Sequence, residues 1–107
     1  MSIPLNGSRF SATATHATAA VATKAAEAGV TQYITDISAS TDKAGAILLV
    51  KQGTTVIWQV QLAATAAGTL VHSHSFATPL AGANGALVSV EVDGTSACKA
   101  NLSGYYI

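Results

Sequence analysis

Alternation between apolar and polar residues is the clearest signal in the chain, and it is sharpest in residues 53–62 (GTTVIWQVQL). A period of two residues sends alternate side chains to opposite faces of a β-strand. One face of this segment carries Val56, Trp58, Val60 and Leu62. The other face carries Ile57 together with Gln59 and Gln61. We therefore expect a central strand of a sheet that packs on the core with one face and meets solvent with the other.

Three further segments show the same period. The side chains expected to face inward are Val88, Val90 and Val92 in residues 86–92, and Cys98, Ala100 and Leu102 in residues 96–105. Ser89 and Glu91 are expected to face outward. Residues 70–76 (LVHSHSF) place Leu70, His72, His74 and Phe76 on one face of a third strand.

Two other segments are strands with apolar residues on both faces. Residues 30–40 (VTQYITDISAS) place Ile37 on one face, with Tyr33, and Ile34 on the other, with Asp36. Residues 45–51 (GAILLVK) form a continuous apolar run, which is typical of a strand covered on both sides. The pairs Gln52-Gly53 and Asp93-Gly94 predict hairpin turns, and the segment from Pro79 to Gly85 predicts a longer turn.

The stretch 11–28 (SATATHATAAVATKAAEA) is ambiguous, because alanine favours a helix and alternating threonine favours a strand. We interpret it as strand, since Val21 is its only bulky aliphatic residue and a helix would have almost nothing to bury. One or two helical turns over residues 19–28, before Gly29, remain an alternative.

Together these segments give seven to eight short strands with turn signals every 8–12 residues, the pattern of an all-β protein. We expect an antiparallel β-sandwich, jelly-roll-like, formed by residues 11–107 as a single domain. Residues 1–10 (MSIPLNGSRF) show no sustained period and predict an extended N-terminal arm. Phe10 is one of its docking points, and a frayed terminus is the alternative.

Charge changes this picture, because only 9% of the residues are charged and five Lys+Arg balance five Asp+Glu. Ordinary proteins have about 25% charged residues. A neutral surface of this kind is at risk of association, so we expect much of it to be covered in an assembly. The scattered lysines and arginine form no basic run, which argues against nucleic acid as a partner.

Location follows from what the sequence lacks. The apolar runs fall short of the ~20 residues that span a bilayer, so we expect no membrane partner. The N-terminal residues lack a basic segment followed by an apolar one, which predicts synthesis in a cytoplasm without secretion.

The nearest thing to a chemical site is the pair His72 and His74, whose imidazoles lie on one face of a strand, roughly 7 Å apart. A metal would need further ligands, and no spacing brings His16, Cys98, Glu91 or Asp93 nearby. We therefore expect no cofactor and favour a subunit contact or a hydrogen-bonding role for the two histidines. A metal site and plain exposure are the alternatives.

Other catalytic or binding groups are weaker still. Ser73, His72 and Asp93 have the side chains of a nucleophilic triad, but no nucleophile elbow surrounds the serine. Glu91 and Asp93 lie on one face beside a turn, yet no calcium-binding loop surrounds them. We expect the protein not to be an enzyme.

The succession GAILLVKQGTTVIWQVQL, FATPLAGANGALVSVEVDG and ANLSGYY resembles small β-sandwich proteins encoded among the virion genes of tailed bacteriophages. The likeness covers residues 30–107 and is one of strand order, turn placement and richness in Thr, Ala and Gly. The resemblance implies a decoration or cement protein on the exterior of a capsid, commonly a homotrimer, that stabilises contacts between capsomers. Its implied partners are the major capsid protein and copies of itself, and its implied location is the virion.

A protein of this kind needs an interface, and apolar residues on otherwise polar faces are the candidates. The residues we expect there are Phe10, Ile34, Ile57, Val71, His72, His74, Tyr105 and Tyr106. The alternative function is a carbohydrate-binding jelly-roll module on a phage fibre or head fibre, with Tyr105 or Tyr106 stacking on a sugar. A third is a small metal-dependent jelly-roll enzyme that uses His72 and His74.

Overall fold

The computed structural model describes residues 8–62 and 70–107, and these ranges contain eight β-strands and no helix. The strands are β1 (Ser8–His16), β2 (Ala19–Lys24), β3 (Gln32–Thr41), β4 (Ile47–Gln52), β5 (Thr55–Gln61), β6 (Leu70–Ala81), β7 (Val88–Asp93) and β8 (Cys98–Tyr106). The all-β prediction is therefore confirmed. Within residues 11–28, residues 11–16 belong to β1 and residues 19–24 form β2, as expected, while residues 25–28 are neither strand nor helix. The helical alternative over residues 19–28 is therefore wrong.

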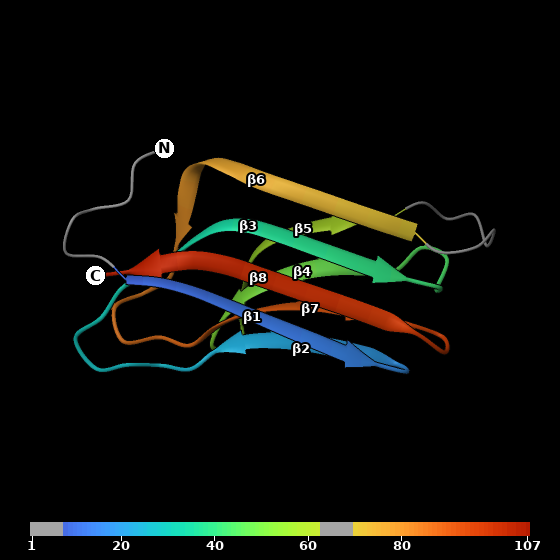
Figure 1. Cartoon of the computed structure of the whole chain (residues 1–107), viewed down its shortest axis with the longest axis horizontal. Helices are drawn as coiled ribbons and strands as arrows, with labels where there is room; N and C mark the ends of the chain where they lie inside the picture. Colours follow the sequence, from blue (N-terminus) through green and yellow to red (C-terminus); the bar gives the residue numbers. More distant parts are fainter. Residues whose placement is uncertain (1–7, 63–69) are drawn as a thin grey trace.

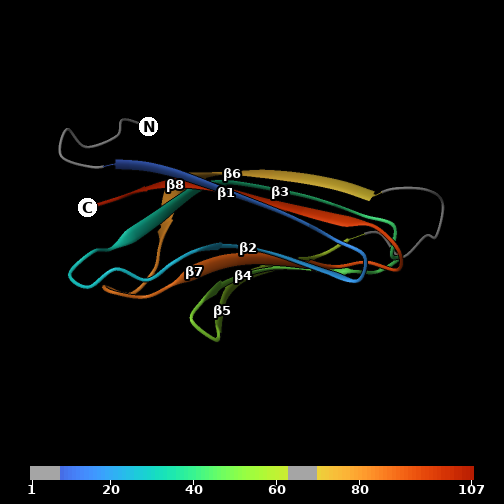
Figure 2. The ribbon, with the colours of Figure 1, turned by 60° about the horizontal axis from the view of Figure 1, so that its bottom comes forward.

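The strands form two four-stranded sheets that lie face to face, as Figures 1 and 2 show. The first sheet has the order β1-β8-β3-β6 and the second the order β2-β7-β4-β5, and every pairing is antiparallel. The chain crosses between the sheets at nearly every connection and leaves its first and last strands side by side. This strand order is that of a jelly roll, so the expected architecture is confirmed.

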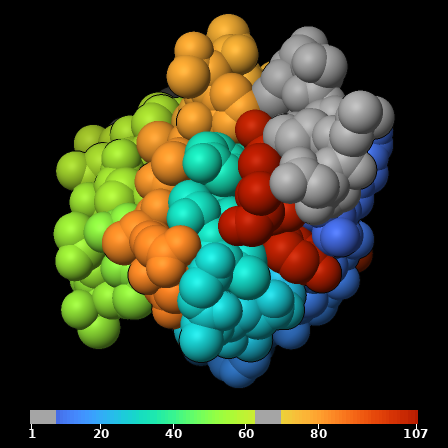
Figure 3. All heavy atoms as spheres, turned by 90° about the vertical axis from the view of Figure 1, so that its left-hand side faces the viewer, coloured from blue at the N-terminus to red at the C-terminus, as the bar shows by residue number. Residues whose placement is uncertain are grey.

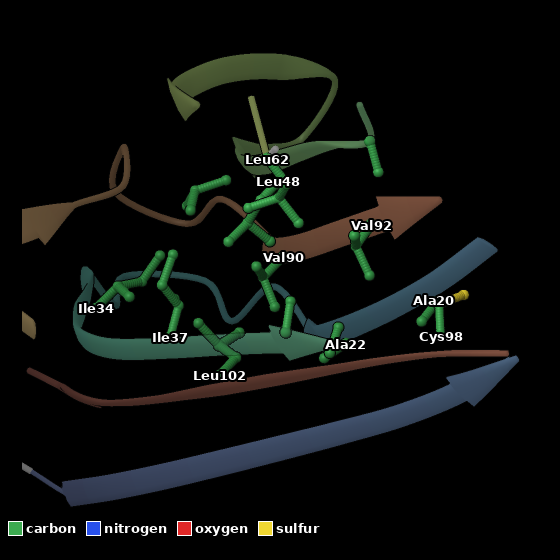
Figure 4. Packing of buried hydrophobic residues seen from close by; sticks show 14 of the residues in the cluster. Ala20, Ala22, Ile34, Ile37, Leu48, Leu62, Val90, Val92, Cys98 and Leu102 are labelled. Carbon is green, nitrogen blue, oxygen red and sulfur yellow. The ribbon is translucent and has the colours of Figure 1, made fainter. Parts of the chain in front are cut away.

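The core lies between the sheets and is built from the alternating positions that the sequence indicates. Figure 4 shows Val90 and Val92 of β7 with Leu48 of β4 on one side and Leu102 of β8 on the other. All four are fully buried. Each such side chain contributes roughly 1.5–3 kcal/mol on leaving water, so this layer holds the two sheets together.

A β-bulge in β3 changes which residues reach this core. The register of β3 against both neighbouring strands shifts between Ile34 and Asp36. Gln32 and Ile34 face inward before the shift, and Ile37 and Ala39 face inward after it. The extra residue reverses the alternation, as bulges do. The expectation that Ile34 shares an outer face with Asp36 is therefore wrong.

Gly104 of β8 lies beside this bulge, between Phe10 and Ile34 in the register. A Cβ atom at position 104 would lie 2.0 Å from the Tyr33 carbonyl oxygen and 2.9 Å from the Phe10 ring. No side chain fits there, so glycine is required for β8 to run between β1 and the bulged β3.

Several sequence-based expectations about pairing need correction. The strand β5 lies at a sheet edge and not at its centre. Asp93-Gly94 links β7 to β8 across the two sheets, so it is not a hairpin, because β8 pairs with β1 and β3. The outer face of β4 is open, with Ile47 exposed. The Gln52-Gly53 hairpin is confirmed, since Gln52 pairs with Thr55.

Two segment boundaries also differ from expectation. Ser8, Arg9 and Phe10 belong to β1 and pair with Tyr106, Tyr105 and Gly104, so the strand begins inside the expected arm. Residues 1–7 lie outside the described ranges. The strand β6 continues through Pro79 to Ala81, which is possible because β6 is an edge strand and proline needs no ladder partner for its nitrogen there.

Loops close the end of the molecule that Figure 3 faces. There the segment 25–31 lies against the segment 82–87 and the end of β8. The Gly85 amide donates to the Val30 carbonyl at 2.7 Å, and Thr31 and Ile107 exchange two backbone hydrogen bonds. On the outer face of the first sheet, the rings of the paired residues Tyr33 and Tyr105 stack with centroids 5.0 Å apart. These contacts hold β3 and β8 together beyond their ladder.

Candidate interaction surface

The outer face of the second sheet carries a group of apolar side chains that nothing in the described chain covers. Val21 of β2, Ile47 of β4 and Val56 of β5 are 44%, 44% and 40% exposed. The half-buried Leu49 lies between them, in register with Glu91 of β7 and Gln59 of β5. We call the surface formed by Val21, Ile47, Leu49 and Val56 the apolar face. The strands β2, β4 and β5 each contribute to this surface, and β7 does not.

The charges on this face neutralise each other. Lys51 Nζ lies 3.1 Å from Glu91 Oε1, and the two side chains are only 24% and 29% exposed. Near the end of β7, Lys43 Nζ lies 3.8 Å from Asp93 Oδ2. Both carboxylates that sequence inspection considers for calcium therefore have a lysine beside them. The apolar face has no net charge, so desolvating it costs less than desolvating isolated ions.

The outer face of the first sheet is different, because it carries small hydroxyl and amide side chains in register. One row across the sheet is Ser11, Ser103, Asp36 and Ser75, and the next is Thr13, Asn101, Ser38 and Ser73. We call these eight residues the polar face. Together with parts of Ala12, Ile37, His74 and Leu102 they line a shallow depression of about 280 Å³.

Hydrogen bonds tie the polar side chains to one another. The Ser75 hydroxyl donates to Asp36 Oδ1 at 2.6 Å, and the Asn101 amide donates to Ser38 Oγ at 3.0 Å. The bond from Ser75, helped by one from Thr35, lowers the pKa of Asp36 below its ordinary value. Asp36 is thus the anionic centre of an otherwise uncharged surface.

A cluster of four rings fills the space between the edge strands β5 and β6. Trp58 of β5 lies with its ring centroid 4.9 Å from that of His74 and 5.5 Å from that of Phe76. His72 lies 6.3 Å from both Trp58 and His74. Its Nε2 atom is buried, and no hydrogen-bond partner for it exists in the described chain. The two histidines do share one face, as the sequence indicates.

The candidate chemical sites do not assemble around these histidines. His72 faces the ring cluster and Ser73 faces outward on the same strand, while Asp93 belongs to the other sheet, so the three do not form a triad. Across residues 8–62 and 70–107, no group of three or more His, Cys, Asp or Glu side chains is arranged to hold a metal ion.

The expected interface residues do not form one surface. Ile34 is 0% exposed and belongs to the core, so its assignment to an interface is wrong; the bulge in β3 turns it inward. Tyr105 is 7% exposed and stacks on Tyr33, so it presents no face to a partner.

The remaining expected residues lie in different places. Phe10 and Ile57 are partly buried against the core, and Tyr106 holds Lys24 Nζ 5.0 Å from its ring centroid. Val71 is 73% exposed on β6, beside His72 and His74. Of the expected interface residues, Val71 is therefore the one that is clearly exposed, and it shares the edge strand β6 with His72 and His74.

The sequence pattern does not predict the apolar face as a whole, although it does indicate one of its residues. Val21 alternates with two buried alanines in β2, so an exposed valine there follows from the period of two. Val56 is read as inward because the period runs unbroken from Trp58, whereas the structure shifts register between Val50 and Lys51 and turns Val56 outward. Whether the other residues of the apolar face lie close together depends on the order of the strands in the sheet, which the period does not give.

Comparisons with known proteins give no relative for this chain. No family model, no curated protein and no solved structure matches it. Within the described residues, no helix is long and apolar enough to cross a membrane.

Proposed function

We propose that this chain is a non-enzymatic structural subunit of a bacteriophage particle, a decoration or cement protein that binds the major capsid protein on the capsid exterior and associates with its own copies. The observation that carries the proposal is the apolar face. The resemblance of residues 30–107 to virion β-sandwich proteins supplies the kind of particle. The parts of the proposal that concern the virion and the capsid rest on that resemblance.

The apolar face has the composition of an interface centre. Interfaces are depleted in unpaired charge at their centre, and exposed apolar patches on a small domain mark contact sites. Here three aliphatic side chains at 40–44% exposure surround an ion pair that is already formed within the chain. A partner that covers this face gains apolar burial without having to supply a counter-charge.

The opposite face suits the exterior of a crowded particle. Its small hydroxyl groups are solvated without carrying charge, and the charged residues on this side of the sheet are Asp36, Lys99 and Arg9. Copies of a protein with zero net charge do not repel one another when many of them lie close together. The homotrimer implied by the resemblance remains a prediction, as does the location on the virion.

Two measurements test this proposal. Peptide mass spectrometry on density-purified virions, from the virus whose genome encodes the chain, should find the chain in stoichiometric ratio to the major capsid protein. Recombinant chain should then co-sediment with capsids that lack it. Ile47→Lys should reduce occupancy at least tenfold, because it places a charge within the apolar face.

Thr13→Lys is the matched control, since it adds the same charge at an exposed position of the polar face. It should leave co-sedimentation unchanged. Absence of the chain from purified virions would refute the location. Equal binding by the two lysine variants would refute the apolar face as the docking surface.

The carbohydrate-binding alternative has one observation in its favour, which is the regular array of hydroxyl and amide groups on the polar face. Jelly rolls serve as lectin domains in other proteins. However, Tyr105 is buried and Tyr106 is covered by Lys24, so neither offers an open ring for a sugar. Glycan-array binding that Asn101→Ala abolishes would favour this alternative over the structural role.

A further inference from the structure

The outer edge of β6 differs from the other three strand edges of the sandwich. Edge strands are normally protected from pairing by charged side chains, bulges or short length. Strand β1 carries Arg9 and β2 carries Lys24, and β5 is interrupted by the register shift opposite Lys51. Strand β6 has twelve residues and no lysine, arginine, aspartate or glutamate.

The first half of β6 is also regular. Leu70 to Ser75 pair with Thr41 to Asp36 in unbroken register, and the irregularity comes only after Ser75. Along this segment Val71, Ser73 and Ser75 point outward and are exposed, with Val71 at 73%. A regularly paired, uncharged segment at a sheet edge, with an exposed valine, is a template for pairing with another strand.

A second and independent observation comes from the inner side of the same segment. His72 Nε2 is buried, and the described chain gives it no hydrogen-bond partner. A buried polar atom in this state costs roughly 1–3 kcal/mol, so native structures usually provide a partner. The carboxylate of Asp36 is bonded to Ser75 on the outer face of the sheet. Three other carboxylates are also engaged elsewhere. Asp42 accepts hydrogen bonds from Thr95 and Ser96, Glu91 pairs with Lys51 of β4, and Asp93 pairs with Lys43 of the connection between β3 and β4.

We propose that two copies of this chain pair antiparallel through the edges of their β6 strands, about a two-fold axis at Ser73. Antiparallel pairing about that residue sets Ser73 opposite Ser73 and His72 opposite His74 of the second copy. Directly opposed side chains in such a pair lie about 5 Å apart at Cβ, which lets the imidazoles bond to one another. The two first sheets then form one continuous eight-stranded sheet.

A second copy fits this edge better than a charged partner would. An uncharged strand pairs with itself without repulsion, and a two-fold contact is self-complementary by construction. The contact also leaves the apolar face free, so it is independent of capsid binding. Pairing through one strand edge is a small contact beside the roughly 1,600 Å² of a standard interface, so we expect a weak, concentration-dependent dimer.

Cysteine cross-linking tests the geometry. Under mild oxidation Ser73→Cys should give a covalent dimer, since the two thiols face each other across the axis. Val71→Cys and Ser75→Cys should not cross-link singly, because like residues would lie four positions apart, roughly 13 Å. The double variant Val71→Cys/Ser75→Cys should cross-link. The wild-type chain, whose Cys98 is buried, should give no cross-linked dimer and serves as the background.

Ser11→Cys is the matched control, since Ser11 is exposed on the same face at the opposite edge of the sheet. Cross-linking from Ser11 equal to that from Ser73 would overturn the proposal. So would sedimentation velocity that shows only monomer up to high concentration, or a trimer that Ser73→Lys leaves intact.

Charge and hydrogen-bonding variants test the energetics. Ser73→Lys should raise the dimer dissociation constant at least tenfold by placing two cations across the axis, while Thr13→Lys should leave it unchanged. His72→Phe keeps the ring but removes the unpartnered nitrogen. It should weaken the dimer severalfold without lowering the melting temperature of the monomer. Unchanged dimerisation in His72→Phe would overturn the role given to His72. Capsid binding is measured separately, so failure here and failure of the proposed function are distinguishable.

Discussion

The two long edges of the sandwich are built from side chains of very different size. At one edge β1 and β2 approach closely, and the facing residues include Ala20 and Ala22 of β2 with Cys98 of β8. We call this the closed edge. At the other, which we call the open edge, the bulky side chains of Trp58, His74 and Phe76 lie between β5 and β6. Figure 2 shows β5 lying away from the first sheet while β1 and β2 converge at their connection.

The difference shows that the volume of facing side chains sets the local separation of the sheets. Alanine pairs let backbones approach, and an indole with two imidazoles holds them apart. The closed edge is lined by small apolar side chains, Ala20, Ala22 and Cys98, all of which are buried. The open edge retains a buried nitrogen without a partner. We therefore expect stability to reside at the closed edge and binding at the open one.

The largest expected effect comes from enlarging a residue at the closed edge. Ala22 is 1% exposed, and Ala22→Leu should lower the free energy of unfolding by about 3 kcal/mol, because the closely approaching sheets leave no room for the added carbons. Urea denaturation followed by tryptophan fluorescence measures this. Ala19→Leu on the exposed side of the same strand should change stability by less than about 0.5 kcal/mol. Equal effects at the two positions would show that the closed edge is not tightly packed.

A smaller loss is expected from shrinking a residue at the open edge. Trp58→Leu should cost about 2 kcal/mol, less than the 3–5 kcal/mol for truncating a fully buried aromatic residue, since Trp58 is partly exposed. Gln59→Leu on the same strand is the control and should be nearly neutral. Thermal melts followed by far-UV circular dichroism give both values. If Trp58→Leu lowered the free energy of unfolding by more than Ala22→Leu does, the open edge and not the closed edge would contribute more to stability.

Replacing the unpartnered imidazole should have a still smaller effect, and one of opposite sign. His72→Phe should leave the unfolding free energy of the monomer within about 1 kcal/mol of wild type, on the stabilising side, because it removes a buried atom that has no bond. Measurement at low protein concentration isolates the monomer. A clear destabilisation would mean that His72 Nε2 has a partner within the chain.

The last prediction concerns pH and the end of the closed edge. Asp42 follows β3 and accepts hydrogen bonds from the Thr95 amide at 2.8 Å and from the amide and hydroxyl of Ser96, which fixes the connection between β7 and β8. The Ser96 hydroxyl is the main cause that lowers the pKa of Asp42 well below its ordinary value of 3.8. A lowered pKa in the folded state means that the stabilisation is complete above the unfolded value and is lost as the pH falls toward the folded one.

Asp42→Asn should therefore be less stable than wild type at neutral pH, and the difference should shrink as the pH falls below 3.8. Chemical denaturation over a pH series gives the difference directly. Asp36→Asn is the comparison, since the pKa of Asp36 is lowered as well but its bonds lie on the polar face. A difference for Asp42→Asn that does not vary with pH would contradict the role of its charge.

The strands and their regular faces could be predicted from sequence, because a period of two is a local property. The period predicts that the valines of β7 and Cys98, Ala100 and Leu102 of β8 face inward, and all of them are buried. The reversals at Ile34 and Val56 could not be predicted, because a bulge depends on the partner strand and leaves no mark in the period. The same period places His72, His74 and Phe76 on one face of β6, but it does not indicate that Trp58 of β5 packs against them.

The candidate surface was harder to predict than the fold for a related reason. Val21, Ile47 and Val56 are far apart in the chain and become neighbours only through the order β2-β7-β4-β5. Each alone is an ordinary aliphatic residue in a strand. Sequence reasoning identified Val71 as exposed, since the residues on either side of it belong to a regular inward row.

The position of β8 has a consequence for biosynthesis. This strand lies between β1 and β3, so the earliest and the intermediate parts of the first sheet are joined by residues 98–106. During translation β1 and β3 emerge well before the segment that connects them, and pairings so distant in sequence form slowly. The nascent chain therefore cannot complete its first sheet before residues 98–106 have emerged, and truncation within β8 should damage folding more than loss of an edge strand, because it removes the partner of both β1 and β3.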